Sequence, residues 1–152
     1  MDTLTLDRIS DSQLDKEYRK RFFLKSGDKL QNAEDATKHF NILFGEDPAR
    51  EHFGIIYLNG ANKVINSEIL FTGSLTTSAV YPREVIKRAL EENAAAILCG
   101  HNHPSGNRNP SQDDLSITKK IKAACDTVDV TLHDHVIVTS EGYYSFADKG
   151  VL

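Results

Sequence analysis

Residues 94–114 of this chain read AAAILCGHNHPSGNRNPSQDD, an apolar run followed by two histidines, a loop and two acidic residues. The first part, Ala94–Gly100, is a short and continuously apolar run, which is typical of a buried strand. His101 and His103 follow this run at strand spacing, and alternate residues of a strand point to the same face of a sheet. The stretch therefore predicts a strand that presents two imidazoles side by side.

A carboxylate follows the two imidazoles in the pattern H-x-H, seven residues, S-x-x-D, in which Ser111 starts a predicted helix and Asp114 lies in its first turn. Two imidazoles and one carboxylate are three of the ligands that zinc takes, and three protein ligands leave one coordination position for water. The pattern therefore predicts a catalytic metal site at His101, His103 and Asp114 rather than a structural one.

Ser111 and Asp114 also fit a helix capping box that needs no metal, although Glu or Gln is more usual at the position of Asp114. A carboxylate there also gains from the helix dipole. The metal interpretation is favoured because the apolar strand, the paired histidines, the Pro-Ser-Gly loop and the carboxylate occur together.

The rest of the chain predicts a mixed α/β sheet with helices packed on it. Asn32 suits the start of a helix over 33–43, and Pro82 suits the first position of another, with apolar residues at Val85, Ile86, Ala89 and Leu90. The strands are expected at 51–60 and 63–73, forming a hairpin with a turn at Asn59-Gly60, and at 128–132, 133–139 and 143–146.

Composition limits the function classes. A chain of 152 residues fits one domain, and its net charge of −4 does not favour generic duplex binding. The chain holds no apolar run of membrane-spanning length and no apolar secretory core in residues 1–7. The cysteines, Cys99 and Cys125, form no C-x-x-C pattern. The expectation is a cytoplasmic protein with reduced thiols.

Residues 1–30 form a short charged N-terminal extension in this interpretation. Within it, Lys16–Lys25 mixes positive charge with aromatic residues. One interpretation is a patch for nucleic acid or an acidic partner. The favoured one is a short surface helix with Tyr18, Phe22 and Phe23 packed onto the domain.

The stretch HNHPSG at 101–106, Pro82-Arg83-Glu84 and Asp134-His135-Val136-Ile137 together resemble the RadC-type branch of the JAMM metalloproteases, also called JAB or MPN+. The resemblance covers about residues 31–152. It implies the JAMM/MPN fold, which is cytidine deaminase-like, with Zn²⁺ held by His101, His103 and Asp114. It also implies a zinc-dependent hydrolase of a peptide or isopeptide bond, acting on an unknown protein or peptide substrate, and a link to DNA repair.

Hydrolysis of an amide needs a base for the attacking water, and Glu51, Glu68 and Glu84 are the candidates. Glu51 is favoured because Glu-x-x-Gly-Ile-Ile resembles the catalytic segment of the family. Glu68 lies mid-strand with no clear direction, and the helix dipole explains Glu84. The family position of Ser111 implies that it donates a hydrogen bond to the developing oxyanion.

A second H-x-H, His133-Asp134-His135, can bind a second metal or substrate, but an orienting or structural role is favoured because no carboxylate follows it in the same pattern. Cys99 is expected in the core, and Arg108 either clamps a substrate carboxylate or is an exposed loop residue.

The alternative function is a non-catalytic JAMM-fold binding module that acts with nucleic acid or a protein partner. Retention of all three expected ligands argues against this module. A zinc deaminase is excluded because H-x-E and P-C-x-x-C are absent.

Overall fold

The computed structural model describes residues 6–74 and 79–152. In this part of the chain, five strands form one mixed sheet in the order β2-β1-β3-β4-β5. Within that sheet, only β3 and β4 pair in parallel, and the other neighbours are antiparallel. The strands are β1 (His52–Leu58), β2 (Val64–Thr72), β3 (Ala96–Asn102), β4 (Thr131–Thr139) and β5 (Gly142–Ser145).

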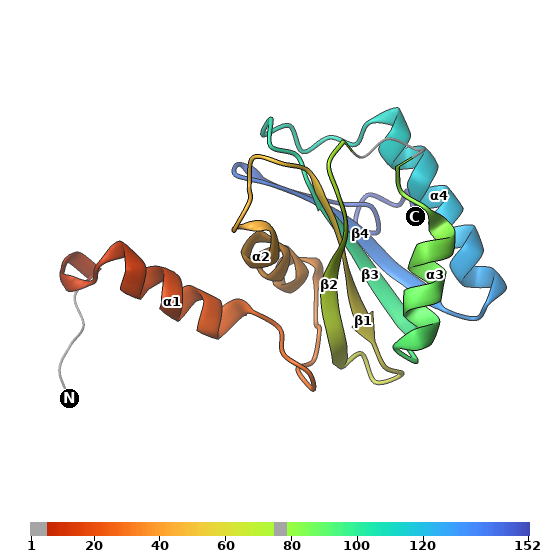
Figure 1. The fold of residues 1–152 in the computed structure, drawn as a ribbon, viewed down its shortest axis with the longest axis horizontal. Coiled ribbons are helices and arrows are strands. Elements are labelled where there is room, and N and C mark those ends of the chain that lie inside the picture. Colours follow the sequence, from red (N-terminus) through yellow and green to blue (C-terminus); the bar gives the residue numbers. More distant parts are fainter. Residues whose placement is uncertain (1–5, 75–78) are drawn as a thin grey trace.

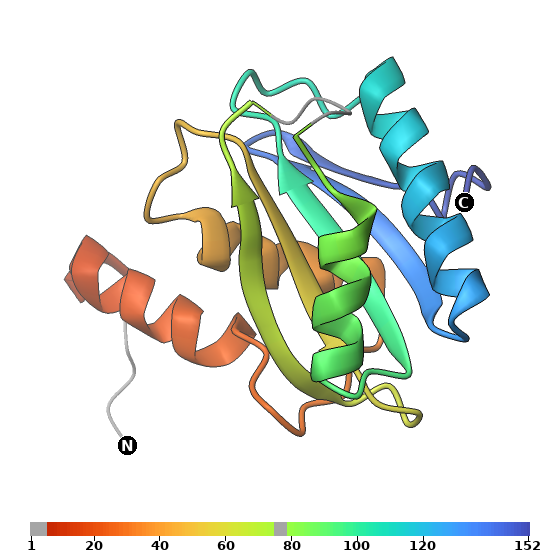
Figure 2. The ribbon, with the colours of Figure 1, turned by 45° about the vertical axis from the view of Figure 1, so that its right-hand side comes forward.

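Helices cover both faces of the sheet (Figures 1 and 2). One face is covered by α2 (Ala33–Phe44), and the other by α3 (Pro82–Glu91) and α4 (Gln112–Thr127). The parallel pair β3 and β4 is joined through α4, as a crossover connection requires. The predicted mixed α/β fold is confirmed.

Strands β1 and β3 lie inside the sheet and are buried along their whole length. Alternate residues of β1 therefore enter two different cores. Phe53, Ile55 and Tyr57 pack against α3 and α4, whereas Ile56 and Leu58 pack with α2. Burial on both faces explains why these strands read as continuous apolar runs in the sequence.

Helix α2 approaches the sheet closely because β3 carries a glycine beneath it. A Cβ atom added to Gly100 would lie 2.4 Å from the ring of Phe40, which is fully buried. A Cβ atom added to Gly54 on β1 would lie 3.0 Å from the same ring. These two glycines seat α2 against the strand that leads to His101.

Two expectations are wrong in detail. Residues 128–132 do not form a separate strand, because Val128 caps α4 and Asp129 turns the chain with a left-handed φ of 60°. A single strand, β4, then runs to Thr139. Leu90, expected on the apolar face of α3, is 52% exposed, because Val85 and Ala89 provide the buried face of that helix.

The segment before the sheet holds a one-turn helix, η1 (Leu6–Arg8), and α1 (Asp11–Phe22). Helix α1 buries none of its residues and projects away from the sheet in Figure 1. Of the expected aromatic contacts, Phe23 packs against His39 of α2, and Lys38 of α2 lies over the ring of Phe22. Tyr18, which was also expected to pack onto the domain, packs on Phe22 of its own helix and is 37% exposed.

Residues 1–5, which make up most of the stretch that lacks an apolar secretory core, lie outside the described residues. Among the helices of 6–74 and 79–152, none combines the length and apolar character that a bilayer crossing demands.

Candidate metal centre

Three elements bring the predicted ligands together. His101 lies at the end of β3, on the face that α3 and α4 cover, and its ring stacks near Phe53 of β1. His103 follows the strand, where its backbone N–H donates to Val138 O of β4 at 3.1 Å. Asp114 lies in the first turn of α4. The loop between the two histidines and α4 therefore returns the chain to the same point.

The side chains converge at distances suited to a shared cation. His101 Nε2 lies 2.9 Å from His103 Nε2 and 3.2 Å from Asp114 Oδ1. His103 Nε2 lies 3.1 Å from Asp114 Oδ2. His101 and Asp114 are buried, and His103 is half-buried. Two imidazoles and one carboxylate suit a borderline metal such as zinc, so this group can hold a metal ion.

The capping interpretation and the metal interpretation are compatible in the structure. Ser111 Oγ accepts the backbone N–H of Asp114 at 3.0 Å, and Asp114 Oδ2 accepts the backbone N–H of Ser111 at 2.8 Å. The same carboxylate faces both imidazoles. The capping box therefore fixes the orientation of the carboxylate that faces the candidate metal position.

Asp114 and His103 shift each other's pKa. Burial favours a raised pKa for Asp114, but hydrogen bonds from His101 and His103 outweigh it and hold that pKa far below its usual range. The hydrogen bond to Asp114 in turn raises the pKa of His103 against the effect of burial. The carboxylate is therefore charged and is available as a ligand.

The second H-x-H does not form a second metal site in the described residues. A β-bulge at this point of β4 pairs Ile97 with Leu132 but Leu98 with Asp134, so the alternation that would align the two histidines is broken. His133 is exposed and bonds Asn62 Oδ1 at 2.8 Å. His135 is buried, and its Nε2 lies 2.7 Å from His101 Nδ1. The favoured role of orientation agrees with this contact.

The three glutamates occupy different surroundings. Glu51, just before β1, lines a cleft of about 530 Å³ together with His103, Ser111 and Asp114. Its charge contributes to the raised pKa of His103. Among the three candidates, Glu51 alone lines this cleft.

Glu68 is engaged elsewhere on β2. Tyr57 donates its hydroxyl to Glu68 Oε1 at 2.6 Å, and Arg88 Nε donates to the same oxygen at 2.7 Å. Burial favours a raised pKa for Glu68, but the hydrogen bonds from Arg88 and Tyr57 lower it below its ordinary value. A carboxylate with a lowered pKa is a weak base. Glu84 lies in the first turn of α3, 3.9 Å from Arg83.

Sequence reasoning missed Asn102, the middle residue of the H-x-H. Its side chain points to the face opposite His101, where Oδ1 accepts the backbone N–H of His52 at 2.6 Å and Nδ2 donates to Arg50 O at 2.8 Å. These two bonds hold the backbone on either side of Glu51. An amide side chain between two predicted ligands was the available signal in the sequence.

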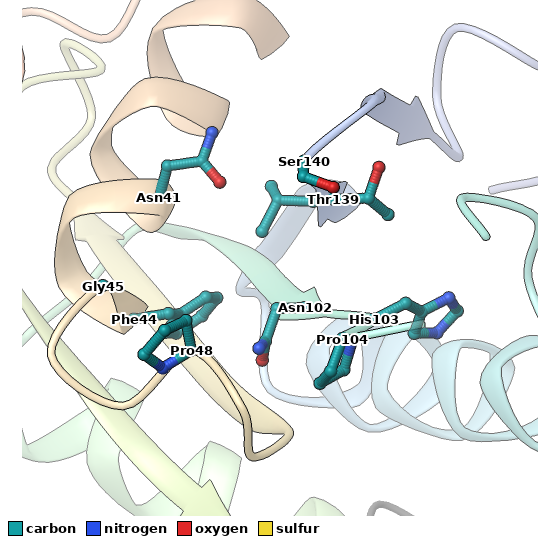
Figure 3. Close-up of a pocket in the computed structure, with 10 residues that line it drawn as sticks. Asn41, Phe44, Gly45, Pro48, Asn102, His103, Pro104, Thr139 and Ser140 are labelled. Atoms are coloured by element: carbon teal, nitrogen blue, oxygen red, sulfur yellow. The ribbon is translucent and has the colours of Figure 1, made fainter. Parts of the chain in front are cut away.

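A second hollow, of about 320 Å³, is also lined by His103 and Pro104 (Figure 3). Asn41 at the end of α2 lies on one side of it, and Thr139 and Ser140 at the end of β4 lie on the other. The two hollows share only the residues His103 and Pro104. Of the three candidate ligands, only His103 lines the second hollow.

Cys99 and Arg108 do not line the cleft. Cys99 is 1% exposed in the core under α3 and α4, as expected. Arg108 is exposed, and its guanidinium lies against Gly142 at the β4–β5 turn.

Comparison with known proteins identifies the family of this chain. The model of the RadC-like JAB domain family matches residues 30–151. A UPF0758 protein of Photobacterium profundum is 43% identical over 129 residues, which cover 85% of this chain and 57% of the relative. The UPF0758 protein YfjY of Escherichia coli (strain K12) is 50% identical over 103 residues, covering 68% and 64%. The chain therefore belongs to the RadC-like JAB domain family, and it spans somewhat more than half the length of these relatives.

Proposed function

We propose that this protein is a zinc-dependent hydrolase of peptide or isopeptide bonds. The observation that carries the proposal is the convergence of His101, His103 and Asp114 beside a cleft that Glu51 and Ser111 also line. Membership of the JAB domain family supports the same reaction class.

His101 Nε2, His103 Nε2 and one oxygen of Asp114 would hold Zn²⁺, which supplies a Lewis acid and lowers the pKa of a coordinated water when it is bound. The donor set fits the ion because His103 Nδ1 donates to Asn107 O at 2.6 Å, and a carbonyl oxygen can only accept. The Nε2 atom of a neutral His103 then carries a lone pair.

In this proposal, Glu51 transfers the proton and Ser111 stabilises the oxyanion. A carboxylate oxygen of Glu51 takes a proton from the attacking water as the water oxygen bonds to the amide carbon. Glu51 then delivers this proton to the leaving nitrogen as the C–N bond breaks. The Ser111 cap uses a lone pair of Oγ, so its O–H can donate to the developing oxyanion.

The test incubates metal-loaded protein with a peptide library and with a panel of isopeptide-linked peptides. Cleavage and metal content are measured on the same samples. We expect Glu51→Gln to lower the rate about 10²–10⁴-fold with metal retained. Glu68→Gln and Glu84→Gln are matched controls that keep the activity of the folded protein.

Two results would overturn parts of this proposal. Full activity in Glu51→Gln with loss in Glu68→Gln would reassign the base. Metal-loaded wild type that cleaves nothing, yet shifts DNA in a salt-dependent way or captures a protein partner, would favour the binding module.

A further inference from the structure

A chain of buried hydrogen bonds runs from the back of His101 into α4. His101 Nδ1 lies 2.7 Å from His135 Nε2, and His135 Nδ1 lies 2.6 Å from Thr118 Oγ1. Thr118 Oγ1 lies 2.6 Å from Asp114 O, one turn earlier on the helix. This chain begins at one candidate ligand and ends on the backbone of another.

The ring of His135 is held in place by its neighbours. It stacks on Phe146 with ring centroids 4.7 Å apart and meets the edge of Phe53 at 5.6 Å. The side chain is fully buried, and neutral imidazole has one donor and one acceptor. The ring of His135 therefore donates to one of His101 and Thr118 and accepts from the other, which gives two possible arrangements of the protons.

Only one order leaves a lone pair for a metal. If Thr118 donates to Asp114 O, its oxygen accepts from His135 Nδ1–H, and His135 Nε2 accepts from His101 Nδ1–H. His101 Nε2 then carries the lone pair that faces His103 and Asp114. If Thr118 donates to His135 instead, the protons reverse along the chain and His101 Nε2 carries a hydrogen.

We propose that Thr118 and His135 are positioning residues that order the protons behind His101, so that His101 Nε2 presents its lone pair to the metal. The inference rests on the metal centre of the proposed function, but it does not require hydrolysis. Partners behind a metal-bound histidine fix its tautomer, and their loss typically costs about 10–100-fold in metal affinity.

The first test compares zinc affinities by competition with a chromophoric chelator. Thr118→Val removes the hydroxyl at nearly constant shape and is expected to weaken binding about 10–100-fold. Thr118→Ser restores the hydroxyl and is expected to bind close to wild type. Thr127→Val is the matched control, because Thr127 makes the same bond to Ala123 O, at 2.9 Å, on an exposed part of α4.

The second test needs no variant. Nitrogen-15 NMR of the histidine rings in zinc-loaded wild type is expected to find the proton of His135 on Nδ1. A proton on Nε2 of His135 in that state would overturn the inference, as would wild-type zinc affinity in folded Thr118→Val.

These outcomes separate the inference from the proposed function. If wild type binds zinc with the expected His135 tautomer and cleaves nothing, the hydrolase proposal is contradicted and the positioning role is supported. If cleavage is intact while Thr118→Val binds zinc as wild type does, the positioning role falls and the hydrolase stands.

Discussion

At the scale of single residues, side chains on the two faces of β3 have different roles at the candidate site. His101 faces α4 and the metal position, whereas Asn102 faces the other way and bonds the backbone at Arg50 and His52. Successive residues of a strand point to opposite faces, so adjacent positions can support a ligand and the proposed base independently.

Asn102→Ala is therefore expected to separate activity from metal binding. Loss of both bonds frees the segment that carries Glu51, and a displaced base can lower kcat by up to about 10²-fold. Zinc affinity is expected to stay at the wild-type value, because Asn102 bonds none of the ligands. Kinetics and chelator competition on the same preparation check this, with Asn66→Ala, which loses a surface bond to Glu92, as the control. A parallel fall in zinc affinity would contradict the assignment.

At the scale of elements, two complete capping boxes in the described part of the chain have different consequences. Ser10 and Gln13 begin α1, which buries no residue, whereas Ser111 and Asp114 begin α4, whose inner face enters the core. The same local device therefore stabilises an exposed helix in one case and shapes the candidate site in the other.

Replacing the cap residues should reveal this difference. Ser111→Ala is expected to lower the free energy of unfolding by about 1 kcal/mol, and Ser10→Ala by less, because α1 contributes nothing to the core. Ser111→Gly costs only a few tenths of a kcal/mol at a cap yet removes the hydroxyl. If Ser111 donates to the oxyanion, Ser111→Gly loses activity by about 10²–10³-fold while its urea midpoint barely moves. Retained activity in Ser111→Gly would exclude that role.

Local patterns predicted most elements and the candidate ligands, because their causes lie within short stretches. The apolar run before His101, the Asn32 cap and Pro82 at the start of α3 all act over a few residues. The bulge at His133 was not predictable, because it depends on pairing with β3, which is separated from β4 in the sequence by the whole of α4. The hydrogen bond between His135 and His101 depends on the same long-range pairing.

Whole-molecule stability should depend on pH through a histidine far from the cleft. His39 of α2 accepts the backbone N–H of Leu24 at 2.8 Å and bonds Ser67 Oγ at 2.8 Å. Burial lowers its pKa to about 4. Below its unfolded pKa of about 6.5, the unfolded chain therefore binds a proton that the native chain resists.

The contribution of His39 to the free energy of unfolding is fully present above pH 6.5. As the pH falls from above 6.5 to below 4, the free energy of unfolding is expected to fall by up to roughly 3 kcal/mol. Urea unfolding of wild type and His39→Gln across this range measures it, since the variant should show a shallower decline. His133→Gln, at an exposed position, is the control. Equal slopes for wild type and His39→Gln would assign the acid sensitivity to other groups.

The candidate ligands meet only when β3, β4 and α4 are assembled, so metal binding and folding are coupled. His101 lies near the end of β3, the backbone N–H of His103 bonds β4, and Asp114 lies in the first turn of the helix that joins these two strands. A metal that binds only the folded chain stabilises it by about 2.7 kcal/mol at 100 times its Kd, which for this size raises Tm by about 5–10 °C.

His103→Ala should abolish the rise in Tm with zinc, whereas His133→Ala, from the other H-x-H, should keep it. If His133→Ala alone abolished the rise, the ion would bind at the wrong pair and both the hydrolase and the ligand set would have to be abandoned. If neither did, zinc would be binding elsewhere on the surface.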